Sequence, residues 1–187
     1  TVGIGLSSDE KYYFITSSDH NTSEQYYFEV NETKPQPKLM QKREKGIIYS
    51  INSWDGFFYI HTNKGAEDFK IDKTNDISFV KWNSYIPAKD ETLIGGLTFL
   101  NNWIIRSEVT NALGKIFVKN LKNEKEEELI FSDEKVFDGG VSLVQKDKNT
   151  DLVHISYSTP KTQSRVYLYN LKSKEKKLVK EQIIPSG

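Results

Sequence analysis

Short runs of apolar residues recur along the chain at nearly constant spacing, and each run follows a polar or glycine turn residue. The four turn residues are Lys11, Gly56, Asn102 and Asp151, so the intervals are 45, 46 and 49 residues. A repeat of about 46 residues that holds four short strands is typical of a β-propeller blade. The pattern therefore predicts an all-β fold with about four four-stranded antiparallel blades of a β-propeller.

Turn residues divide each repeat into four predicted strands. The predicted strands cover residues 3–7, 12–16, 25–30 and 38–41; 46–51, 57–62, 68–71 and 77–82; 93–99, 103–108, 115–120 and 128–131; and 140–145, 152–158, 165–170 and 177–180. The second strands are apolar at consecutive positions, which indicates that both faces are covered. The fourth strands are more polar, as expected of outer edges. The blades then span roughly residues 1–43, 44–91, 92–137 and 138–187.

Two charged stretches, residues 123–128 and 173–177, permit two interpretations. Each could begin a helix, but each follows a copy of the triplet Asn-Leu-Lys, at residues 120–122 and 170–172. The matching positions favour a solvated hairpin turn between the third and fourth strands over a helix.

The composition argues against several classes of function. The 187 residues include 26 basic and 26 acidic side chains, so the formal net charge is zero, and no basic stripe indicates a nucleic-acid partner. The apolar runs are far shorter than the roughly 20 residues that span a bilayer, which argues against a membrane partner. Cysteine is absent, which removes disulfides and thiolate chemistry and fits a reducing compartment. We therefore expect a cytoplasmic protein.

The two ends of the chain indicate that it belongs to a longer polypeptide. Thr1 rather than methionine opens the sequence, directly before an apparent strand, and residues 184–187 resemble a linker. A targeting signal would then lie outside residues 1–187.

The sequence contains no recognisable catalytic motif. It lacks the Gly-x-Ser-x-Gly elbow, the Gly-x-x-x-x-Gly-Lys phosphate loop and the His-Glu-x-x-His metal motif. The three histidines, His20, His61 and His154, occupy unmatched positions in different repeats. Packing or hydrogen-bonding roles are therefore favoured over metal ligation.

The series Asp68, Asp72 and Asp76 resembles a calcium loop. It lacks the glycine and the closing glutamate of that motif, so roles in turns are the favoured interpretation. We therefore assign no catalytic, cofactor-binding or metal-binding residue, and we expect no cofactor.

Two classes of function remain from the residues alone. One is a stand-alone β-propeller scaffold that binds a protein or a small ligand and has no enzymatic activity. The other is a non-catalytic propeller that serves an enzyme whose chemistry lies elsewhere in the same polypeptide. The repeat pattern is compatible with both classes.

The second repeat carries a more specific pattern than its spacing. The segments concerned are Tyr49-Ser50-Ile51-Asn52, residues 56–63, residues 66–71, and Trp82 with Tyr85-Ile86-Pro87. Together they resemble the propeller of the oligopeptidase B (protease II) branch of the prolyl oligopeptidase family. The resemblance covers nearly the whole chain and is strongest over residues 42–120. Ala88-Lys89 departs from the usual His-Arg of the family, and Asp68 from the usual asparagine.

The resemblance implies a seven-bladed propeller over a C-terminal α/β-hydrolase domain of the same polypeptide, which holds a Ser-Asp-His triad. It implies a serine oligopeptidase that cleaves short basic peptides after lysine or arginine, with the propeller as a size-selective cap. No residue of the triad falls on this chain, so we expect the chain alone to be inactive.

Blades that form only part of a propeller ring leave the flanks of the first and last blades without neighbouring blades to cover them. These flanks include apolar residues of 12–15 and 152–158, so the isolated chain is expected to self-associate or to close into a distorted array. The loops between second and third strands, at residues 17–23, 63–67, 109–114 and 158–164, are expected to share one face. The resemblance assigns that face to the hydrolase side.

Overall fold

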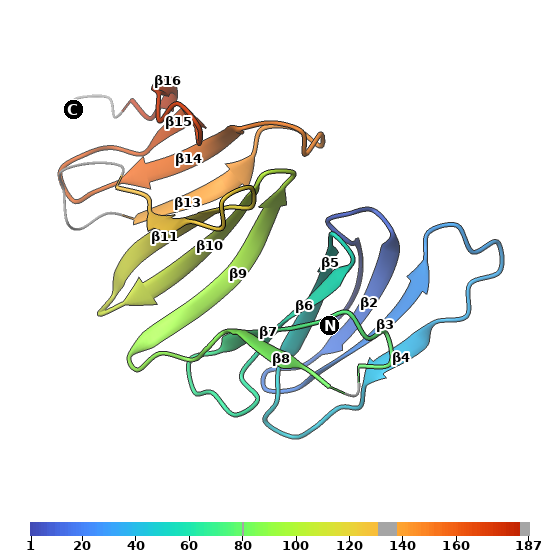
Figure 1. The fold of residues 1–187 in the computed structure, drawn as a ribbon. Coiled ribbons are helices and arrows are strands. Elements are labelled where there is room, and N and C mark those ends of the chain that lie inside the picture. Colours follow the sequence, from blue (N-terminus) through green and yellow to red (C-terminus); the bar gives the residue numbers. More distant parts are fainter. Residues whose placement is uncertain (80, 131–137, 184–187) are drawn as a thin grey trace. The chain divides into compact units, whose positions relative to one another are not determined.

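The structure, a computed structural model, describes residues 1–79, 81–130 and 138–183 (Figure 1). Within these residues it has sixteen strands in four antiparallel sheets of four, and no helix. The prediction of an all-β chain with four four-stranded units is confirmed. The chain divides into two compact units, Thr1–Ile94 and Gly95–Gly187.

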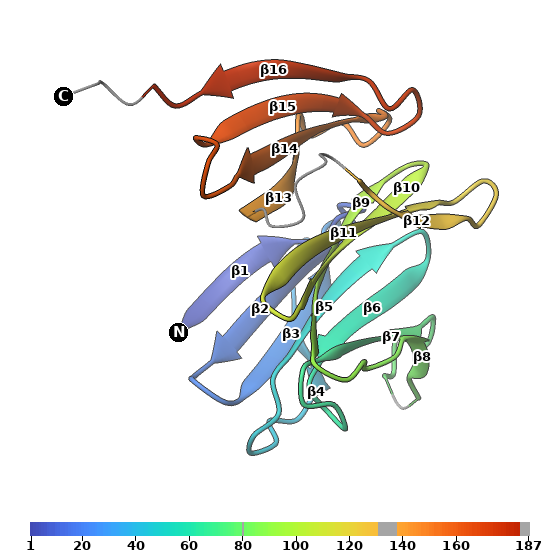
Figure 2. The same ribbon diagram turned by 90° about the vertical axis from the view of Figure 1, so that its left-hand side faces the viewer.

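The first unit contains two sheets in which the strands follow chain order (Figure 2). One sheet consists of β1 (Val2–Leu6), β2 (Tyr12–Ser18), β3 (Ser23–Glu29) and β4 (Lys38–Gln41). The other consists of β5 (Tyr49–Trp54), β6 (Phe57–Thr62), β7 (Lys70–Thr74) and β8 (Asn83–Ile86). Asp55 and Gly56, with φ of 50° and 76°, form the two-residue turn between β5 and β6, where positive φ matches the twist of the hairpin.

The core of the first unit joins alternate side chains of its two sheets. Its buried members are Phe14, Tyr27, Met40, Tyr49, Ile51, Phe58, Ile60 and Phe79. Successive residues of a strand point to opposite faces, so each strand contributes every second side chain to this core. The ring centroids of Phe58 and Phe79 lie 4.9 Å apart in an edge-to-face arrangement, which adds to the energy of burial.

Buried hydrogen bonds also connect the two sheets of the first unit. The hydroxyl of Ser23 accepts from the N–H of Tyr49 at 2.7 Å and donates to its carbonyl at 2.8 Å. The N–H of Ile51 donates to Oε1 of Gln25 at 2.7 Å. The phenol of Tyr49 donates to the carbonyl of Gln41 at 2.6 Å. Polar side chains of one sheet thus satisfy backbone groups of the other.

The second unit contains the two remaining sheets. One consists of β9 (Thr92–Leu100), whose first residues belong to the first unit, β10 (Trp103–Thr110), β11 (Leu113–Asn120) and β12 (Glu126–Glu128). The other consists of β13 (Asp138–Leu143), β14 (Leu152–Ser158), β15 (Arg165–Asn170) and β16 (Lys176–Glu181). Their shared core includes Ile105, Val118, Val153, Ile155 and Tyr169.

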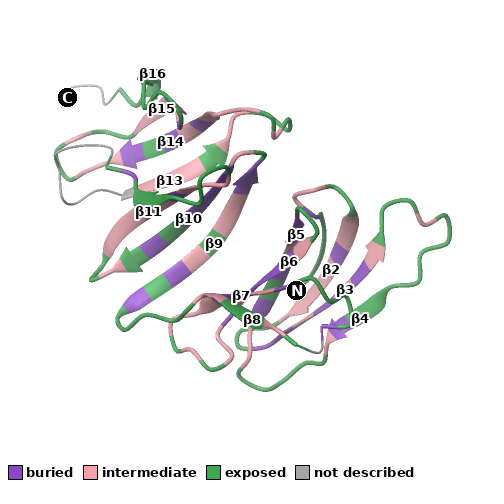
Figure 3. Ribbon diagram, viewed as in Figure 1, coloured by how far each residue is buried: buried purple, intermediate pink, exposed green. Residues whose placement is uncertain are grey.

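The outer edges of the two sheets of the second unit are polar, as the sequence predicts. Every residue of β12 and of β16 is exposed, and both strands are rich in charged side chains; Figure 3 shows β16 in the colour of exposed residues. Each of these strands lies at the edge of its sheet. Charged edges of this kind oppose pairing with other chains.

The two charged stretches begin in hairpin turns, as predicted, and continue into the strands β12 and β16, and neither forms a helix. The N–H of Asn120 donates to the carbonyl of Lys125 at 2.8 Å, and the N–H of Asn170 to that of Glu175 at 2.9 Å. In both turns the asparagine side chain accepts from a backbone N–H two residues later. This local Asx bonding favours a turn over a helix.

The prediction of a strand at residues 77–82 is wrong. The fourth strand of this sheet is β8, and the residues before it form a turn. Both carboxylate oxygens of Asp76 accept hydrogen bonds from Ser78, and the N–H of Phe79 donates to the carbonyl of Asp76 at 3.1 Å. Phe79 adopts a φ of 53° and is buried in the core of the first unit. An apolar residue therefore enters the core from a turn rather than from a strand.

Other strand boundaries are displaced from the predictions by a few residues. The strand expected at 46–51 is β5 at Tyr49–Trp54, the one expected at 68–71 is β7, and the one expected at 140–145 is β13. The strand expected at 128–131 ends at Glu128, and Phe131 lies outside the described residues. The predicted strands 57–62, 152–158 and 165–170 have the observed bounds.

Candidate functional site

The three histidines have different settings. His20 is exposed in the turn after β2, whereas His61 on β6 and His154 on β14 are half-buried. Over residues 1–79, 81–130 and 138–183, no group of three or more histidine, cysteine or acidic side chains could hold a metal ion. In the same residues no helix is long and apolar enough to cross a membrane.

His61 has a specific hydrogen-bonded position. Its Nε2 lies 2.7 Å from the carbonyl oxygen of Ile94, and its ring stacks on Phe69 with centroids 4.7 Å apart. Burial lowers the pKa of His61, although the hydrogen bond to Ile94 acts in the opposite direction. A neutral imidazole that donates from Nε2 fits this environment, because the carbonyl can only accept.

The three aspartates of the calcium-like series have separate partners. The carbonyl of Asp68 accepts from the N–H of Ile94 at 3.0 Å. The carboxylate of Asp72 is buried and lies 3.0 Å from Nζ of Lys70, and that of Asp76 caps the turn before β8. The structure thus places each aspartate in a local backbone or ion-pair role.

A buried ion network on β10 and β12 is a polar feature that the sequence analysis did not identify. Arg106 is 4% exposed and Glu108 3%. The guanidinium donates to Glu108 at 2.8 Å and to both carboxylate oxygens of Glu126 at 2.8 and 3.0 Å. Its carbon Cζ lies 4.7 Å from the ring centroid of Phe117. The two-residue spacing of Arg106 and Glu108 puts both on one face of β10, and is the sequence signal that could have revealed the pair.

The network sets the electrostatics of this face of β10. Burial by itself would lower the pKa of Arg106, but the hydrogen bonds to Glu126 and Glu108 and the charges of both carboxylates raise it. Arg106 is therefore a permanent cation with two acidic partners. The arrangement leaves no free base or nucleophile there, and it links β10 to β12 across the strand β11 that lies between them.

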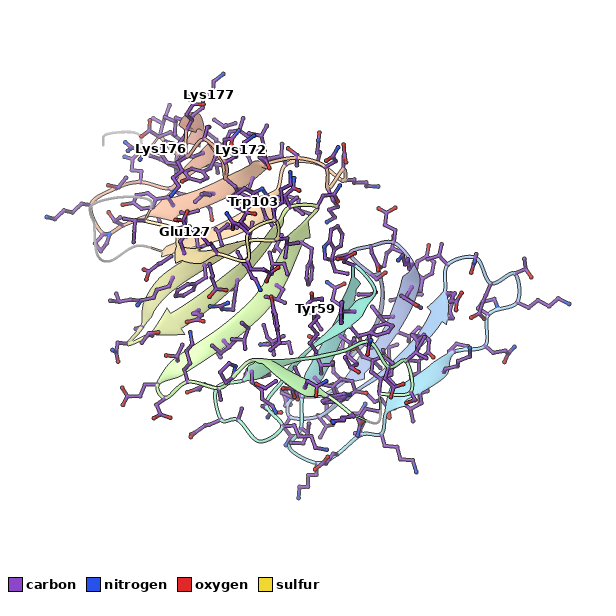
Figure 4. The ribbon with its side chains drawn as sticks, viewed as in Figure 1. Tyr59, Trp103, Glu127, Lys172, Lys176 and Lys177 are labelled. Carbon is purple, nitrogen blue, oxygen red and sulfur yellow. The ribbon has the colours of Figure 1, made fainter. Side chains whose placement is uncertain are left out.

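Each unit also contains a cavity. In the first unit a cavity of about 290 Å³ is lined by Gln41, Lys64, Lys70, Asp72, Phe79 and Trp82. In the second unit a cavity of about 210 Å³ has a mainly apolar floor that includes Leu129, Tyr169 and Leu171. At its rim Nζ of Lys174 lies 2.8 Å from Oε1 of Glu127 (Glu127 is labelled in Figure 4).

Repeated four-stranded antiparallel sheets, with an apolar core shared by the two sheets of each unit, define the class of β-propeller domains. A profile of the prolyl oligopeptidase N-terminal β-propeller domain matches residues 1–182. The chain therefore belongs to the prolyl oligopeptidase family and corresponds to its N-terminal propeller domain.

Two curated relatives match nearly the whole chain. Dipeptidyl aminopeptidase BI of Pseudoxanthomonas mexicana is 25% identical over 187 residues, which cover 98% of this chain and 25% of the relative. Protease 2 of Moraxella lacunata is 26% identical over 197 residues, which cover 99% of this chain and 26% of the relative. The chain thus spans about a quarter of the length of each relative.

Solved structures show the same likeness. Oligopeptidase B of Trypanosoma brucei, in a closed form with covalently bound antipain, superposes with a TM-score of 0.87 at 25% identity. The superposition covers 98% of this chain and 27% of that one. Oligopeptidase B of Leishmania major has a TM-score of 0.84 at 14% identity, covers 100% and 28% of the two chains, and shows the shared fold. The resemblance drawn from the second repeat is confirmed.

Proposed function

We propose that this chain is the non-catalytic propeller portion of a serine oligopeptidase that cleaves short peptides after lysine or arginine. The observation that carries the proposal is the likeness to the Trypanosoma brucei oligopeptidase B over 98% of the chain, at 25% identity and a TM-score of 0.87. The relative named Protease 2 supports the same branch of the family. The nucleophile would belong to a C-terminal hydrolase domain of the same polypeptide.

In this proposal the propeller acts as a size-selective cap. It supplies no acid, base or nucleophile, and its contribution is a stiff wall that admits oligopeptides and excludes folded proteins. Stiffness is supported by the bonding inside the first unit, where the buried side chains of Ser23 and Gln25 hold the backbone of β5. A cap built in this way changes access to the active site rather than the chemistry.

The specificity is tested with the complete polypeptide that contains this chain. Chromogenic peptides that end in arginine, lysine or proline, and a dipeptidyl substrate, are assayed side by side. We expect cleavage after arginine and lysine, and none by the chain alone, because the nucleophile is elsewhere. Release of dipeptides instead would favour the activity named for the Pseudoxanthomonas mexicana relative. A polypeptide without a hydrolase segment would favour the stand-alone scaffold.

The role as a cap is tested by substrate length. Peptides with one common arginine cleavage site and increasing length are compared, followed by a folded protein that carries the same site in a loop. We expect kcat/KM to fall steeply with length. In a matched polypeptide, Gln25→Ala loosens β5. This variant should cleave long peptides with a higher kcat/KM than the unmodified enzyme, and short peptides with the same kcat/KM. Length-independent cleavage by the unmodified enzyme would contradict the size filter.

A further inference from the structure

The cavity of the first unit combines groups from both sheets. Gln41 comes from β4, Lys64 from the loop after β6, and Lys70 and Asp72 from β7. Phe79 and Trp82 come from the connection between β7 and β8. Its volume of about 290 Å³ lies at the lower end of the range for small-molecule sites. The proposed peptidase function assigns no role to these residues.

Trp82 contributes its indole ring to one wall of the cavity. Among the described residues, Nε1 of Trp82 is buried and has no hydrogen-bond partner. Indole nitrogen can only donate, and a buried donor without a partner is unfavourable for the folded state. Since Nε1 is buried, an acceptor atom in the cavity does not reach it, and Trp82 contributes its ring rather than its donor to the lining. The ring itself packs against Tyr49, with centroids 6.4 Å apart, so its position is fixed by the core.

Two ammonium groups line the same cavity. Nζ of Lys64 lies 2.7 Å from Glu44 in an ion pair whose side chains are 44% and 53% exposed, so water weakens that pair. Nζ of Lys70 lies 3.0 Å from the buried carboxylate of Asp72. A lysine ammonium has three donors, and each of these has one carboxylate partner, so donors remain for a ligand. The lining itself carries two positive charges and one negative charge.

The apolar part of the lining is aromatic and packs into the core. Phe79 is buried and packs edge-to-face on Phe58 and on Tyr27, with centroid distances of 4.9 and 6.1 Å. Together with Trp82 it offers aromatic surface beside the lysines. A ligand that fits both halves has an anionic end with acceptor oxygens and a small apolar group.

We propose that this cavity binds a small organic carboxylate, such as the free carboxyl end of an amino acid or of a very short peptide. The carboxylate oxygens accept from Lys64 and Lys70, and the apolar group lies against Phe79 and the ring of Trp82. Asp72 keeps Lys70 in place. The inference does not depend on the peptidase activity, since it concerns binding to this chain alone.

The test uses the complete chain with tryptophan labelled by ¹⁵N, and two matched probes, N-acetylphenylalanine and its amide. The three tryptophans give three indole signals, and Trp82→Phe identifies the one from Trp82. We expect the acid to shift the Trp82 signal in a saturable way, and the neutral amide to bind roughly tenfold or more weakly. Binding of unmodified phenylalanine, compared with that of N-acetylphenylalanine, shows whether the cavity prefers a free amino acid or the end of a blocked peptide.

Matched lysine variants complete the test. Lys64→Met and Lys70→Met should each weaken binding of N-acetylphenylalanine about tenfold or more, whereas Lys42→Met, at an exposed position outside the lining, should not. Thermal unfolding of each variant shows that the fold persists. Equal binding of acid and amide, equal effects of all three lysine variants, or an unmoved Trp82 signal would overturn the proposal. All readouts are binding measurements, so an inactive polypeptide leaves the test intact.

Discussion

The indole Nε1 of Trp103 donates a hydrogen bond of 2.7 Å to Oδ1 of Asp151 (Trp103 is labelled in Figure 4). Trp103 begins β10, and Asp151 is the turn residue before β14, so the bond joins corresponding ends of two successive sheets. The carbonyl of Asp151 also accepts from the N–H of Leu171 at 2.8 Å. One turn residue of the repeat therefore has a long-range structural role within the second unit.

Asp151→Ala should lower the free energy of unfolding by about 1–3 kcal/mol, because it leaves the indole N–H of the buried Trp103 without its acceptor. Asp151→Asn is the matched control: its amide oxygen can still accept, so its loss should be clearly smaller. Urea denaturation measures both. A double-mutant cycle with Trp103→Phe should show coupling between the two positions, and strictly additive losses would show that the bond contributes nothing.

Arg106→Met should destabilise the chain by about 3–5 kcal/mol, since it leaves the buried Glu108 carboxylate without its cation. The double variant Arg106→Met with Glu108→Leu removes both buried charges and should recover much of that loss. Chemical denaturation of the single and double variants tests the point. A double variant less stable than the single one would mean that the charges stabilise the fold by more than their desolvation costs.

Stability should fall at alkaline pH because of Tyr49. Burial is the main cause that raises its pKa from 10.0 to about 12. The folded pKa exceeds the unfolded one, so the contribution is fully present below pH 10 and is lost as pH rises from about 10 to 12. It amounts to up to about 2–3 kcal/mol. Unfolding free energies measured against pH should show this decline, and Tyr49→Phe should flatten part of it; identical slopes would contradict the assignment.

Gly95→Ala should destabilise the second unit by about 1–3 kcal/mol through overpacking. An added Cβ would overlap Oγ of Ser107 and lie 2.8 Å from the carbonyl oxygen of the same residue. Gly96→Ala is the matched control, because nothing lies within 4 Å of a Cβ there. Both glycines are in β9, so strand propensity cancels in the comparison. Equal effects on the unfolding midpoint would rule out the steric explanation.

The isolated chain should associate as its concentration rises. Ile4 on β1 is 65% exposed and lies opposite Ile15 on β2. The corresponding pair in the next sheet is Ile51 and Ile60, and there Ile51 is only 4% exposed. An apolar face that is covered in one sheet is therefore open in the other. Ile4→Lys should reduce association in light scattering, whereas Ile77→Lys, in a turn, should not. A monomer at every concentration would refute this prediction.

The sequence by itself determined the repeat and the type of its elements. Apolar runs after Gly56 and Asp151 predicted strands with the observed bounds, β6 and β14, because strand and turn chemistry is local. The copies of Asn-Leu-Lys placed two hairpins correctly, since asparagine bonds its own turn. The motifs around Tyr49 also indicated the family.

Only the tertiary structure decided which polar and apolar groups meet. Phe79 belongs to an apolar run that predicts a strand, but Asp76 forms a turn there and the ring enters the core made by residues of both sheets. The pairing of Arg106 with Glu126 and the cavity beside Trp82 arise from residues far apart in sequence. Such contacts depend on the register and packing of whole sheets, which no local pattern specifies.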